Sequence, residues 1–350
     1  MFSKDGVILL PSYQPEETLI NLSRGLSLEG FFVLIVDDGS GEKYQHIFEA
    51  CKKYATVIGY EKNQGKGFAL KHGFKYCLDN LKDYHYVVTA DGDGQHRIDD
   101  IVKVYERCKK QNVSVIGVRK FDVKVPIKSK LGNKLSKFNQ SLVTNRYMHD
   151  NQCGLRGFPY SILPDMIKIF GSRYEYEMNV LTFLQVKELP FQCLRIQTIY
   201  ENNNSGSHFR PIADTLRIQS SILLYGLINI ILFIALAISN YFVYKYVDFG
   251  LAINLEVSTS LVFSGYLLAM IITKLVIYRP KYPAKLVLRV VLYELLKFIA
   301  LLVSVTLFVR VLSLNIFLTY LICYVLTLLP RYYLVKGIGL VYDANINDDN

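Results

Sequence analysis

The segment Tyr86–His96 reads YVVTADGDGQH, an apolar run that breaks into two aspartates, Asp91 and Asp93, one residue apart. Its β-branched first half predicts a buried strand. Because side chains along an extended backbone repeat with period two, we expect both aspartates to point to the same side. Two such carboxylates repel each other unless a cation lies between them, and hard oxygen donors suit Mg²⁺ or Mn²⁺. Gln95 could add a neutral oxygen and Gly92 leaves room for a ligand; a turn rich in Asp and Gly is the alternative interpretation.

The segment belongs to a regular alternation of strand and helix patterns. Short apolar runs predict strands at residues 7–10, 32–36, 56–60, 84–90 and 113–118, and segments of helical character lie at residues 16–26, 44–54, 67–81 and 98–110. This alternation predicts an α/β fold with an open, mainly parallel, Rossmann-like sheet. Ligands bind such sheets outside the carboxyl ends of the strands, where this chain carries polar residues. No GxGxxG or GxxxxGK[ST] motif follows a strand, which disfavours dinucleotide-binding and P-loop folds.

Four motifs at these strand ends together resemble a known family. They are Pro11-Ser12-Tyr13, Val36-Asp37-Asp38-Gly39-Ser40, Asn63-Gln64-Gly65-Lys66-Gly67 and Asp91-Gly92-Asp93-Gly94-Gln95-His96. In this order and spacing they resemble a family 2 glycosyltransferase of the GT-A fold. They are most similar to its polyprenyl-phosphate branch, which includes dolichyl-phosphate mannose synthases and bactoprenol glucosyltransferases. The resemblance covers roughly the first 215 residues.

The resemblance implies a set of donor-side residues. It implies a nucleoside diphosphate sugar as donor, with a UDP-hexose expected from the bacterial branch. The nucleotide sugar would be bound by Pro11, Tyr13, Glu16, Asp37, Asp38, Lys66, Asp91 and Gly92. The metal, Mg²⁺ or Mn²⁺, would be held by Asp91, Asp93 and Gln95, with Asp93 counted among the catalytic residues.

The class of acceptor is predicted from the absence of a motif that would supply a general base. Transfer to a sugar hydroxyl needs a general base, which polymerising relatives supply from a Glu-Asp pair, alongside a Gln-x-x-Arg-Trp motif. This chain has no Glu-Asp dipeptide and no tryptophan. A phosphate monoester needs no base, since its second pKa is about 6, but it needs cations. The candidates are Arg119, Lys128, Lys130 and Arg210, of which the resemblance makes Arg119 and Lys130 catalytic.

A stripe of apolar residues follows the last of these strands. It consists of Leu131, Leu135, Phe138, Leu142 and Val143, with Lys130, Lys134 and Lys137 close by. This pattern is typical of an amphipathic helix that lies on a membrane surface and meets a lipid phosphate. An ordinary helix packed against the protein core has the same pattern, and the sequence leaves both interpretations open.

The second half of the chain predicts an all-α membrane domain. Hydrophobic residues make up 51% of the 350 residues, and the mean hydropathy is +0.22. Four transmembrane helices are expected at residues 218–244, 252–277, 290–309 and 311–333. The predicted organisation is a cytosolic α/β domain over residues 1–216, a four-helix transmembrane domain over 217–338 and a polar tail over 339–350. The basic loop at residues 279–285 and the lack of a signal peptide predict a multi-pass cell-membrane protein with its catalytic domain and both termini in the cytoplasm.

The four predicted spans resemble the GtrA-like family, proposed partners of polyprenyl-phosphate glycosyltransferases in moving lipid-linked sugars. The expected activity is therefore inverting, metal-dependent transfer of one sugar to polyprenyl (undecaprenyl) phosphate, giving a lipid-linked donor for cell-envelope glycans. A flippase or scaffold that binds nucleotide sugar without turnover, and a plain membrane anchor, stay open as alternatives. The formal net charge of +10 is spread over both halves, which speaks against nucleic acid as a partner. The expected partners are the donor, the lipid phosphate and the bilayer, and a homo-oligomer is compatible with the sequence.

Overall fold

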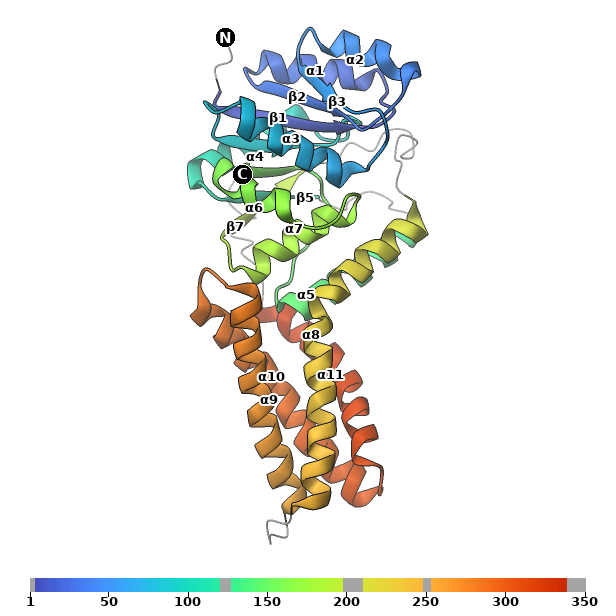
Figure 1. Cartoon of the computed structure of the whole chain (residues 1–350), viewed down its shortest axis with the longest axis vertical. Coiled ribbons are helices and arrows are strands. Elements are labelled where there is room, and N and C mark those ends of the chain that lie inside the picture. Colours follow the sequence, from blue (N-terminus) through green and yellow to red (C-terminus); the bar gives the residue numbers. More distant parts are fainter. Residues whose placement is uncertain (1–3, 120–126, 198–209, 248–252, 339–350) are drawn as a thin grey trace.

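A computed structural model describes residues 4–119, 127–197, 210–247 and 253–338. It consists of an α/β region followed by a bundle of long helices, which is set below the sheet in Figure 1. The strands are β1 (Gly6–Ser12), β2 (Phe32–Asp37), β3 (Thr56–Gly59), β4 (Tyr86–Thr89), β5 (Ser114–Arg119), β6 (Arg156–Pro159) and β7 (Phe191–Ile196). The helices of the α/β region are α1 (Thr18–Leu28), α2 (Gln45–Cys51), α3 (Lys66–Asn80), α4 (Ile98–Gln111), α5 (Ile127–Thr144), α6 (Leu163–Lys168) and α7 (Glu175–Val186), with 3₁₀ turns at Glu42–Tyr44 and Tyr160–Ile162.

The strands form one mixed sheet that is mostly parallel. Its order is β3-β2-β1-β4-β6-β5-β7, with parallel pairing everywhere except along β6, which runs antiparallel to both β4 and β5. The predicted α/β fold is confirmed, and all five predicted strands and four predicted helices are present with ends shifted by a few residues. The central strand β1 is buried along its whole length, as expected for a strand covered on both faces.

Two strands were not predicted from the sequence. β6 is only four residues long and includes Gly157 and Pro159, neither of which favours a strand. It forms because it pairs with two neighbours at once, with Thr89 opposite Arg156 and Ile116 opposite the same residue. β7 lies at the edge of the sheet and pairs only with β5. Inserting β6 brings residues just before Arg156 to the end of β4.

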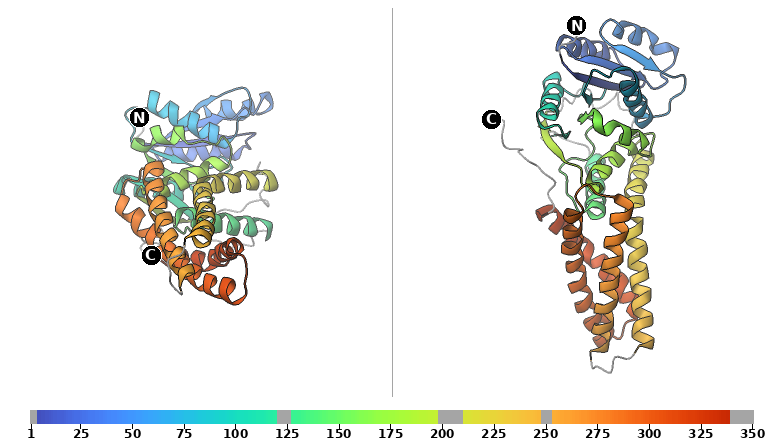
Figure 2. Two further views of the ribbon diagram at one scale, coloured as in Figure 1. Left: turned by 60° about the horizontal axis from the view of Figure 1, so that its bottom comes forward. Right: turned by 60° about the vertical axis from the view of Figure 1, so that its left-hand side comes forward.

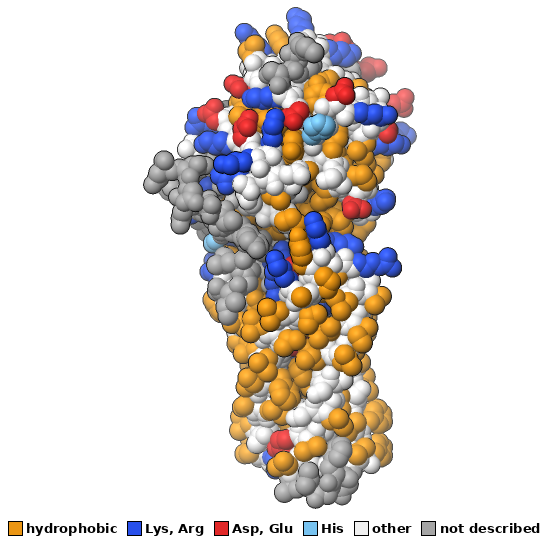
Figure 3. Space-filling model, turned by 90° about the vertical axis from the view of Figure 1, so that its left-hand side faces the viewer, with side chains coloured by type: hydrophobic (Ala, Val, Ile, Leu, Met, Phe, Trp, Pro, Cys, Tyr) orange, Lys and Arg blue, Asp and Glu red, His pale blue; other side chains and the backbone are white. Residues whose placement is uncertain are grey.

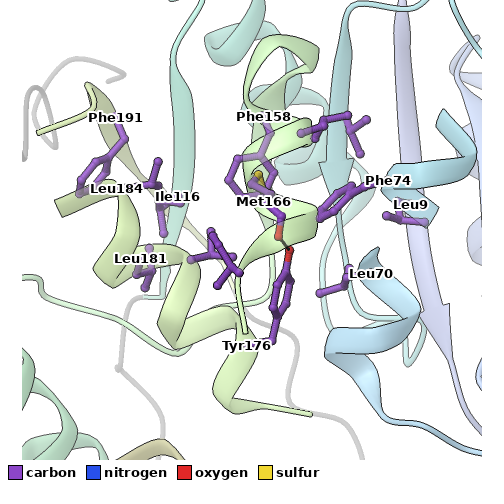
Figure 4. Packing of buried hydrophobic residues seen from close by; sticks show 14 of the residues in the cluster. Leu9, Leu70, Phe74, Ile116, Phe158, Met166, Tyr176, Leu181, Leu184 and Phe191 are labelled. Atoms are coloured by element: carbon purple, nitrogen blue, oxygen red, sulfur yellow. Dashed lines mark hydrogen bonds between the residues drawn. The ribbon is translucent and has the colours of Figure 1, made fainter. Parts of the chain in front are cut away.

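Apolar side chains fill both faces of the sheet. On one face, Leu9 of β1 packs with Leu70 and Phe74 of α3 and with side chains of α6 and α7 (Figure 4). There the Tyr176 hydroxyl donates a hydrogen bond to the carbonyl oxygen of Met166 at 2.9 Å. The other face is covered by α1, α2 and α4. The core therefore fixes both layers of helices and, with them, the loops at the strand ends.

The bundle contains four long helices. They are α8 (Pro211–Tyr246), α9 (Asn254–Tyr278), α10 (Pro283–Ser304), which continues into a π-helical turn at Val305–Val311, and α11 (Ile316–Ile338). Three of them are long and apolar enough to cross a membrane, over Ala213–Tyr246, Asn254–Tyr278 and Ile316–Lys336. The fourth long helix, α10, overlaps the predicted span at residues 290–309 but is not among these three, because it carries Lys285, Arg289, Glu294 and Lys297. That all four helices span a membrane stays a prediction. The predicted division between residues 216 and 217 falls inside the continuous helix α8.

The α/β region meets one end of the bundle through several polar contacts. Glu188, just after α7, accepts hydrogen bonds from Arg146 and, at 2.7 Å, from Arg289 of α10. The backbone N–H of Lys281 donates to the carbonyl oxygen of Lys187 at 2.7 Å. The turn between α9 and α10 and the end of α11 therefore lie on the α/β side, whereas the turn before α11 lies at the far end (Figures 1 and 2).

Helix α5 lies at this junction, beside the first part of α8 (Figures 1 and 2). Phe138 packs on Tyr332 of α11 with ring centroids 5.1 Å apart. Val143 clusters with Ile218 and Ile222 of α8. These members of the predicted stripe pack against protein, as in the core-facing interpretation, while Leu135 is exposed.

The surface differs sharply between the two parts. In the view of Figure 3, charged side chains gather over the α/β region and hydrophobic side chains cover most of the bundle. Many large apolar residues of α8, α9 and α11 are exposed there, including Leu224, Leu268 and Leu326. Contiguous apolar surface of this extent marks a face that is buried in a membrane or against another apolar surface.

Candidate active site

The candidate site lies at the carboxyl ends of β1, β2 and β4. These strands are parallel, so their last residues reach the same edge of the sheet. The backbone N–H of Asp38 donates to the carbonyl oxygen of Ser12 at 2.8 Å, which joins the ends of β1 and β2. The hydroxyl of Thr89, the last residue of β4, donates to the carbonyl oxygen of Gly154 at 2.9 Å. The segment before β6 is thereby held at the same edge.

Asp38 organises the loop that precedes α3. Its buried carboxylate accepts hydrogen bonds from the Tyr60 hydroxyl at 2.7 Å, the Asn63 amide at 2.9 Å, and the backbone N–H groups of Gln64 at 2.8 Å and Gly65 at 2.9 Å. Gly65 has φ +100°, a conformation that residues with a Cβ rarely adopt. These contacts fix the loop and place Lys66, the first residue of α3, at the edge of the sheet.

Lys66 joins two carboxylates from distant parts of the chain. Its ammonium Nζ lies 2.5 Å from Asp91 Oδ1 and 2.9 Å from Glu177 Oε2. Burial alone would lower the pKa of Lys66, but the two carboxylates outweigh it and hold this pKa above its usual value. Burial would raise the pKa of Asp91, but Lys66 and His96 hold it well below its usual range. An ammonium and an ionised Asp91 therefore face each other at neutral pH.

A turn, not a strand, brings Asp91 and Asp93 together. β4 ends at Thr89, and Gly92 and Asp93 form a turn, so the argument from strand periodicity was wrong. The two side chains are still near each other, and burial together with the negative charge of Asp91 raises the pKa of Asp93. Asp93 also accepts a hydrogen bond from the backbone N–H of Gln95 at 3.1 Å. The turn, and not a strand, therefore sets the relative position of the two carboxylates.

Two glycines permit close packing around Asp91. A Cβ added to Gly92 would lie 2.6 Å from Ser12 Oγ. A Cβ added to Gly154 would lie 2.8 Å from Asp91 Oδ2 and 3.0 Å from Lys66 Nζ. The buried His96 places its Nε2 3.4 Å from Asp91 Oδ2. The Asp91 carboxylate is thus held from several sides.

The donor chemistry at the turn fits a hard divalent cation. Asp91 and Asp93 supply interacting carboxylates, and Gln95, two residues on, carries an amide oxygen; Mg²⁺ and Mn²⁺ prefer such donors. In the part of the chain that the structure describes, no three His, Cys, Asp or Glu side chains are gathered for metal binding. One oxygen of Asp91 is engaged by Lys66, which compensates part of the negative charge.

The other predicted donor-side residues surround this centre without all facing it. Pro11 is buried at the end of β1, Tyr13 is partly buried just beyond it, and Glu16 is exposed. Asp37 is buried and accepts a hydrogen bond from the backbone N–H of Ser40 at 2.8 Å. Asp37 and Asp38 therefore shape loops at the edge, and their contacts with a nucleotide sugar stay predictions.

Of the four predicted acceptor cations, the structure describes the side-chain surroundings of Arg119 and Arg210. Arg119 donates from Nε to Asp150 Oδ2 at 2.7 Å and from Nη2 to Asp150 Oδ1 at 3.1 Å, a bidentate pair with a buried carboxylate. This pair compensates much of the charge that a phosphate would use. Arg210 is exposed and lies 3.6 Å from Asp214 at the start of α8. Lys128 and Lys130 fall on the first turn of α5, where the side chains lie outside the described residues.

Glu177 and Asp150 are charged partners that the sequence analysis did not propose. Glu177 is brought to Lys66 because α3 and α7 pack closely: a Cβ added to Gly67 would lie 2.4 Å from Tyr176 Cβ. Gly65 and Gly67, which flank Lys66, are the sequence feature that could have indicated this close approach. The pairing of Asp150 with Arg119 depends on how the chain returns to the sheet after α5.

A family model described as "Glycosyl transferase family 2" matches residues 8–166. The match begins within β1 and extends past β6, includes the turn with Asp91 and Asp93, and ends before the helical bundle.

Among curated proteins, an uncharacterized protein of Methanocaldococcus jannaschii is 30% identical over 182 residues, which is 49% of this chain and 78% of that protein. The UDP-N-acetylglucosamine–dolichyl-phosphate N-acetylglucosaminyltransferase of Methanococcus voltae is 28% identical over 215 residues, covering 55% and 85% of the two chains. The dolichyl-phosphate beta-glucosyltransferase of Saccharomyces cerevisiae is 24% identical over 224 residues, covering 52% and 65%.

Among solved structures, the glucosyl-3-phosphoglycerate synthase of Mycobacterium tuberculosis in complex with Mn²⁺, UDP-glucose and phosphoglyceric acid superposes with a TM-score of 0.48 at 15% identity. The superposition covers 64% of this chain and 80% of that one.

Proposed function

Because the chain belongs to glycosyl transferase family 2, we propose that it is an inverting, metal-dependent glycosyltransferase that moves one sugar from a nucleoside diphosphate to polyprenyl phosphate. The proposed donor is a UDP-hexose and the proposed acceptor in the cell is undecaprenyl phosphate. Two of the similar curated proteins are named for transfer to dolichyl phosphate, which supports an acceptor of this class.

The observation that carries the proposal is the position of the site on the bundle. Glu177, which holds Lys66, is followed on α7 by Met178, and Met178 packs in one cluster with Ile218 and Ile222 of α8. The site edge is therefore one helix away from the first of three helices that can span a membrane. A site so placed suits one water-soluble substrate and one that lies in the membrane.

The residues of the site have separable roles in the proposed reaction. Asp91 and Asp93, with Gln95, would hold a divalent cation, which when bound neutralises charge on the departing diphosphate. Lys66 holds Asp91 in place and Glu177 holds Lys66. A phosphate oxygen of the acceptor would form the bond to the anomeric carbon while the bond from that carbon to the diphosphate breaks.

Two of the carboxylates at the centre, those of Asp91 and Glu177, support an acceptor that needs no base. Asp91 and Glu177 are both engaged by Lys66, and the low pKa of Asp91 makes it a weak base. A phosphate monoester arrives ionised, because its second pKa is about 6. Arg119, Lys128, Lys130 and Arg210 stay the proposed acceptor-side cations, with Arg119 needing to share its charge between Asp150 and the phosphate.

We further propose that the helical region anchors the site at the inner face of the cell membrane. On this proposal, all four helices α8 to α11 cross the bilayer, α10 with Glu294 and Lys297 buried inside the bundle, so that both termini lie in the cytoplasm. Residues 217–338 then act with the soluble part as a GtrA-like unit. The apolar surface of the bundle supports this arrangement (Figure 3).

A donor screen tests the proposed activity. Purified full-length protein would be given labelled UDP- and GDP-sugars, Mg²⁺ or Mn²⁺, and polyprenyl phosphate, and the lipid fraction analysed for an acid-labile glycolipid. We expect one UDP-hexose to be transferred, with loss of transfer in Asp93→Ala and full activity in Asp79→Ala, a change at an exposed position of α3. Undiminished transfer by Asp93→Ala would falsify the metal role.

A further inference from the structure

Three basic side chains are buried inside the helical bundle, one on each of three helices. Lys274 of α9, Lys297 of α10 and Arg331 of α11 are exposed by only 3%, 3% and 6%. Lys and Arg are almost never so buried unless an acceptor accompanies them, because an unpaired charge in an apolar interior is costly. The position of all three therefore requires a compensating group.

One carboxylate, Glu294 of α10, faces these cations in the described part of the chain. Its Oε2 lies 2.5 Å from Lys297 Nζ, and its charge also interacts with those of Arg331 and Lys274. We call these four residues the bundle cation cluster. It contains three positive charges and one negative charge.

The other acidic residues described in α8 to α11 do not belong to the cluster. Asp214 lies within 4 Å of Arg210 and Arg217 at the start of α8. Glu256 pairs with Arg310 at 2.5 Å, at the opposite end of the bundle from the α/β region. The surplus of two positive charges in the bundle cation cluster is therefore not balanced by described side chains.

Lys297 is well satisfied at the deep end of the cluster. Besides Glu294, its Nζ lies 3.0 Å from the Tyr266 hydroxyl. The same Nζ lies 5.4 Å, 5.4 Å and 5.9 Å from the ring centres of Phe233, Tyr266 and Tyr324. Such rings attract a cation. Lys297 therefore needs no further partner.

Lys274 and Arg331 can each donate further hydrogen bonds. Within the described residues, Lys274 Nζ has no hydrogen-bond acceptor and lies 6.0 Å from the ring centre of Tyr278. Arg331 Nη2 donates to the carbonyl oxygen of Leu142 at 3.1 Å and to Asn145 Oδ1 at 2.7 Å, whereas its Nε is buried with no partner there. A buried donor without an acceptor, such as Arg331 Nε, is costly, and an oxyanion beside it and Lys274 would satisfy it.

The unsatisfied part of the cluster lies toward the α/β region. At a rise of about 1.5 Å per residue, Lys274 is ~6 Å from the end of α9 at Tyr278, and Lys297 is ~21 Å from the start of α10 at Pro283. Both of these helix ends are on the α/β side (Figure 1). Lys274 and Arg331 thus lie between the soluble region and the deeper Lys297–Glu294 pair.

We propose that Lys274 and Arg331, with Lys297 behind them, bind the phosphate of a lipid head group between α9, α10 and α11. A phosphate monoester brings up to two negative charges and three acceptor oxygens, which match the charge surplus and the unpaired donors. A lipid is preferred to free phosphate because the helices around the cluster present apolar side chains on their outer surface. The proposal rests on the proposed function only in naming a prenyl phosphate as the natural occupant.

Binding to the full-length protein in phosphatidylcholine nanodiscs tests the inference. The probes are a short-chain prenyl phosphate, the matching prenyl alcohol and inorganic phosphate, and the readouts are the ligand-dependent rise in the thermal midpoint and direct binding by native mass spectrometry. We expect the prenyl phosphate to bind and the alcohol not to bind. Equal binding of the alcohol would overturn the anion site, and equal stabilisation by inorganic phosphate would overturn its assignment to a lipid.

Matched variants locate the binding. Lys274→Met should weaken prenyl phosphate binding about tenfold, the loss expected for one charge-assisted contact, while Lys274→Arg should keep it. Lys285→Met changes an exposed lysine at the start of α10 and should have no effect. If Lys274→Met does not fold, Lys274→Gln against Lys274→Arg makes the same comparison. Unchanged affinity in the neutral variant would overturn the proposal.

The outcome is separable from that of the proposed transferase activity. No sugar donor is present in the binding experiment, so Lys274-dependent binding would stand even if no donor were ever transferred. Conversely, if Arg119→Met removed all prenyl phosphate binding and Lys274→Met removed none, the acceptor would bind only at the edge of the sheet. That result would reject the bundle site and leave the proposed activity intact.

Discussion

The edge of the sheet and the interior of the bundle both concentrate charge, but with opposite surplus. At the edge, carboxylates outnumber the single ammonium of Lys66. In the bundle, three cations share Glu294. A surplus of negative charge repels a diphosphate unless a divalent cation lies between them, whereas a surplus of positive charge attracts a phosphate directly. Under the two proposals, the sign of the surplus separates a metal-dependent site at the edge from a metal-independent one in the bundle.

The two regions also differ in how their charges are fixed. At the edge, Asp91 and Asp93 come from a turn, while Lys66 and Glu177 come from the first turns of α3 and α7, and glycines such as Gly154 allow them to approach. In the bundle, each charged side chain comes from the middle or end of a long helix, so its position depends on how the helices pack.

The largest effect is expected from Glu294→Gln. The change leaves Lys297 buried without its carboxylate and raises the cluster surplus from two to three charges. Breaking a buried ion pair in this way costs about 3–5 kcal/mol. The measurement is the thermal midpoint of the purified protein in detergent.

Glu256→Gln is the matched control, because it breaks a pair with Arg310 that is partly exposed at the far end of the bundle. Exposed pairs contribute about 0–1 kcal/mol. Equal thermal midpoints for the two variants would show that the buried Glu294–Lys297 pair contributes no more to stability than the partly exposed Glu256–Arg310 pair.

Asp91→Asn should abolish most transfer without a comparable loss of stability. The change removes the charge that Lys66 faces and that a divalent cation would need, so we expect the turnover rate to fall at least about a hundredfold. Asp79→Asn, at an exposed position, should keep full activity. Activity of Asp91→Asn near that of the control would remove the edge site from the mechanism. Prenyl phosphate binding in the bundle should be unchanged in both.

Glu177→Gln should lower turnover about tenfold, which is the effect of weakening one hydrogen bond to a charged group. Glu177 acts through Lys66, so it is a positioning residue. We expect kcat to fall while KM for the donor changes little, because the lysine remains but is less well held. Glu106→Gln, on the exposed face of α4, is the control. A rise in KM with unchanged kcat would instead indicate direct donor binding.

Gly154→Ala should have the smallest effect. The atoms nearest to the new Cβ would be the outer atoms of Asp91 and Lys66, which can move aside, so the thermal midpoint should change little. Turnover should fall about threefold, or ~0.6 kcal/mol in the activation barrier, because the pair is displaced. Gly265→Ala, where no atom lies within 4 Å of the new Cβ, should match the wild type. Loss of folding in Gly154→Ala would show that the edge is as rigid as the bundle.

Local sequence patterns predicted the α/β fold because each element carries its own signal. The strand β1 is a continuous apolar run, and α4 has acidic residues in its first turn and basic residues in its last. β6 has no such signal, since its four residues become a strand only by pairing with β4 and β5. The aspartate pair was predicted for the wrong reason: the backbone turns at Gly92, and glycine-rich turns defeat a period-two argument.

The charge partners were the hardest part to predict. The sequence places Lys66 and Glu177 more than a hundred residues apart, and their contact depends on the packing of α3 on α7. The sequence did show Glu294 and Lys297 three residues apart, but not that Lys274 and Arg331 face them from other helices. Sequence patterns therefore give the elements, and packing decides which charges meet.

The proposed activity is transfer of a sugar to a phosphate and not to a hydroxyl. The most direct test gives the purified full-length protein a labelled donor, Mg²⁺ and equal amounts of polyprenyl phosphate or the matching polyprenyl alcohol in separate reactions. We predict an acid-labile glycolipid from the phosphate and none from the alcohol. Equal transfer to the alcohol would contradict the account, because that reaction needs a general base that the engaged carboxylates of Asp91 and Glu177 do not supply.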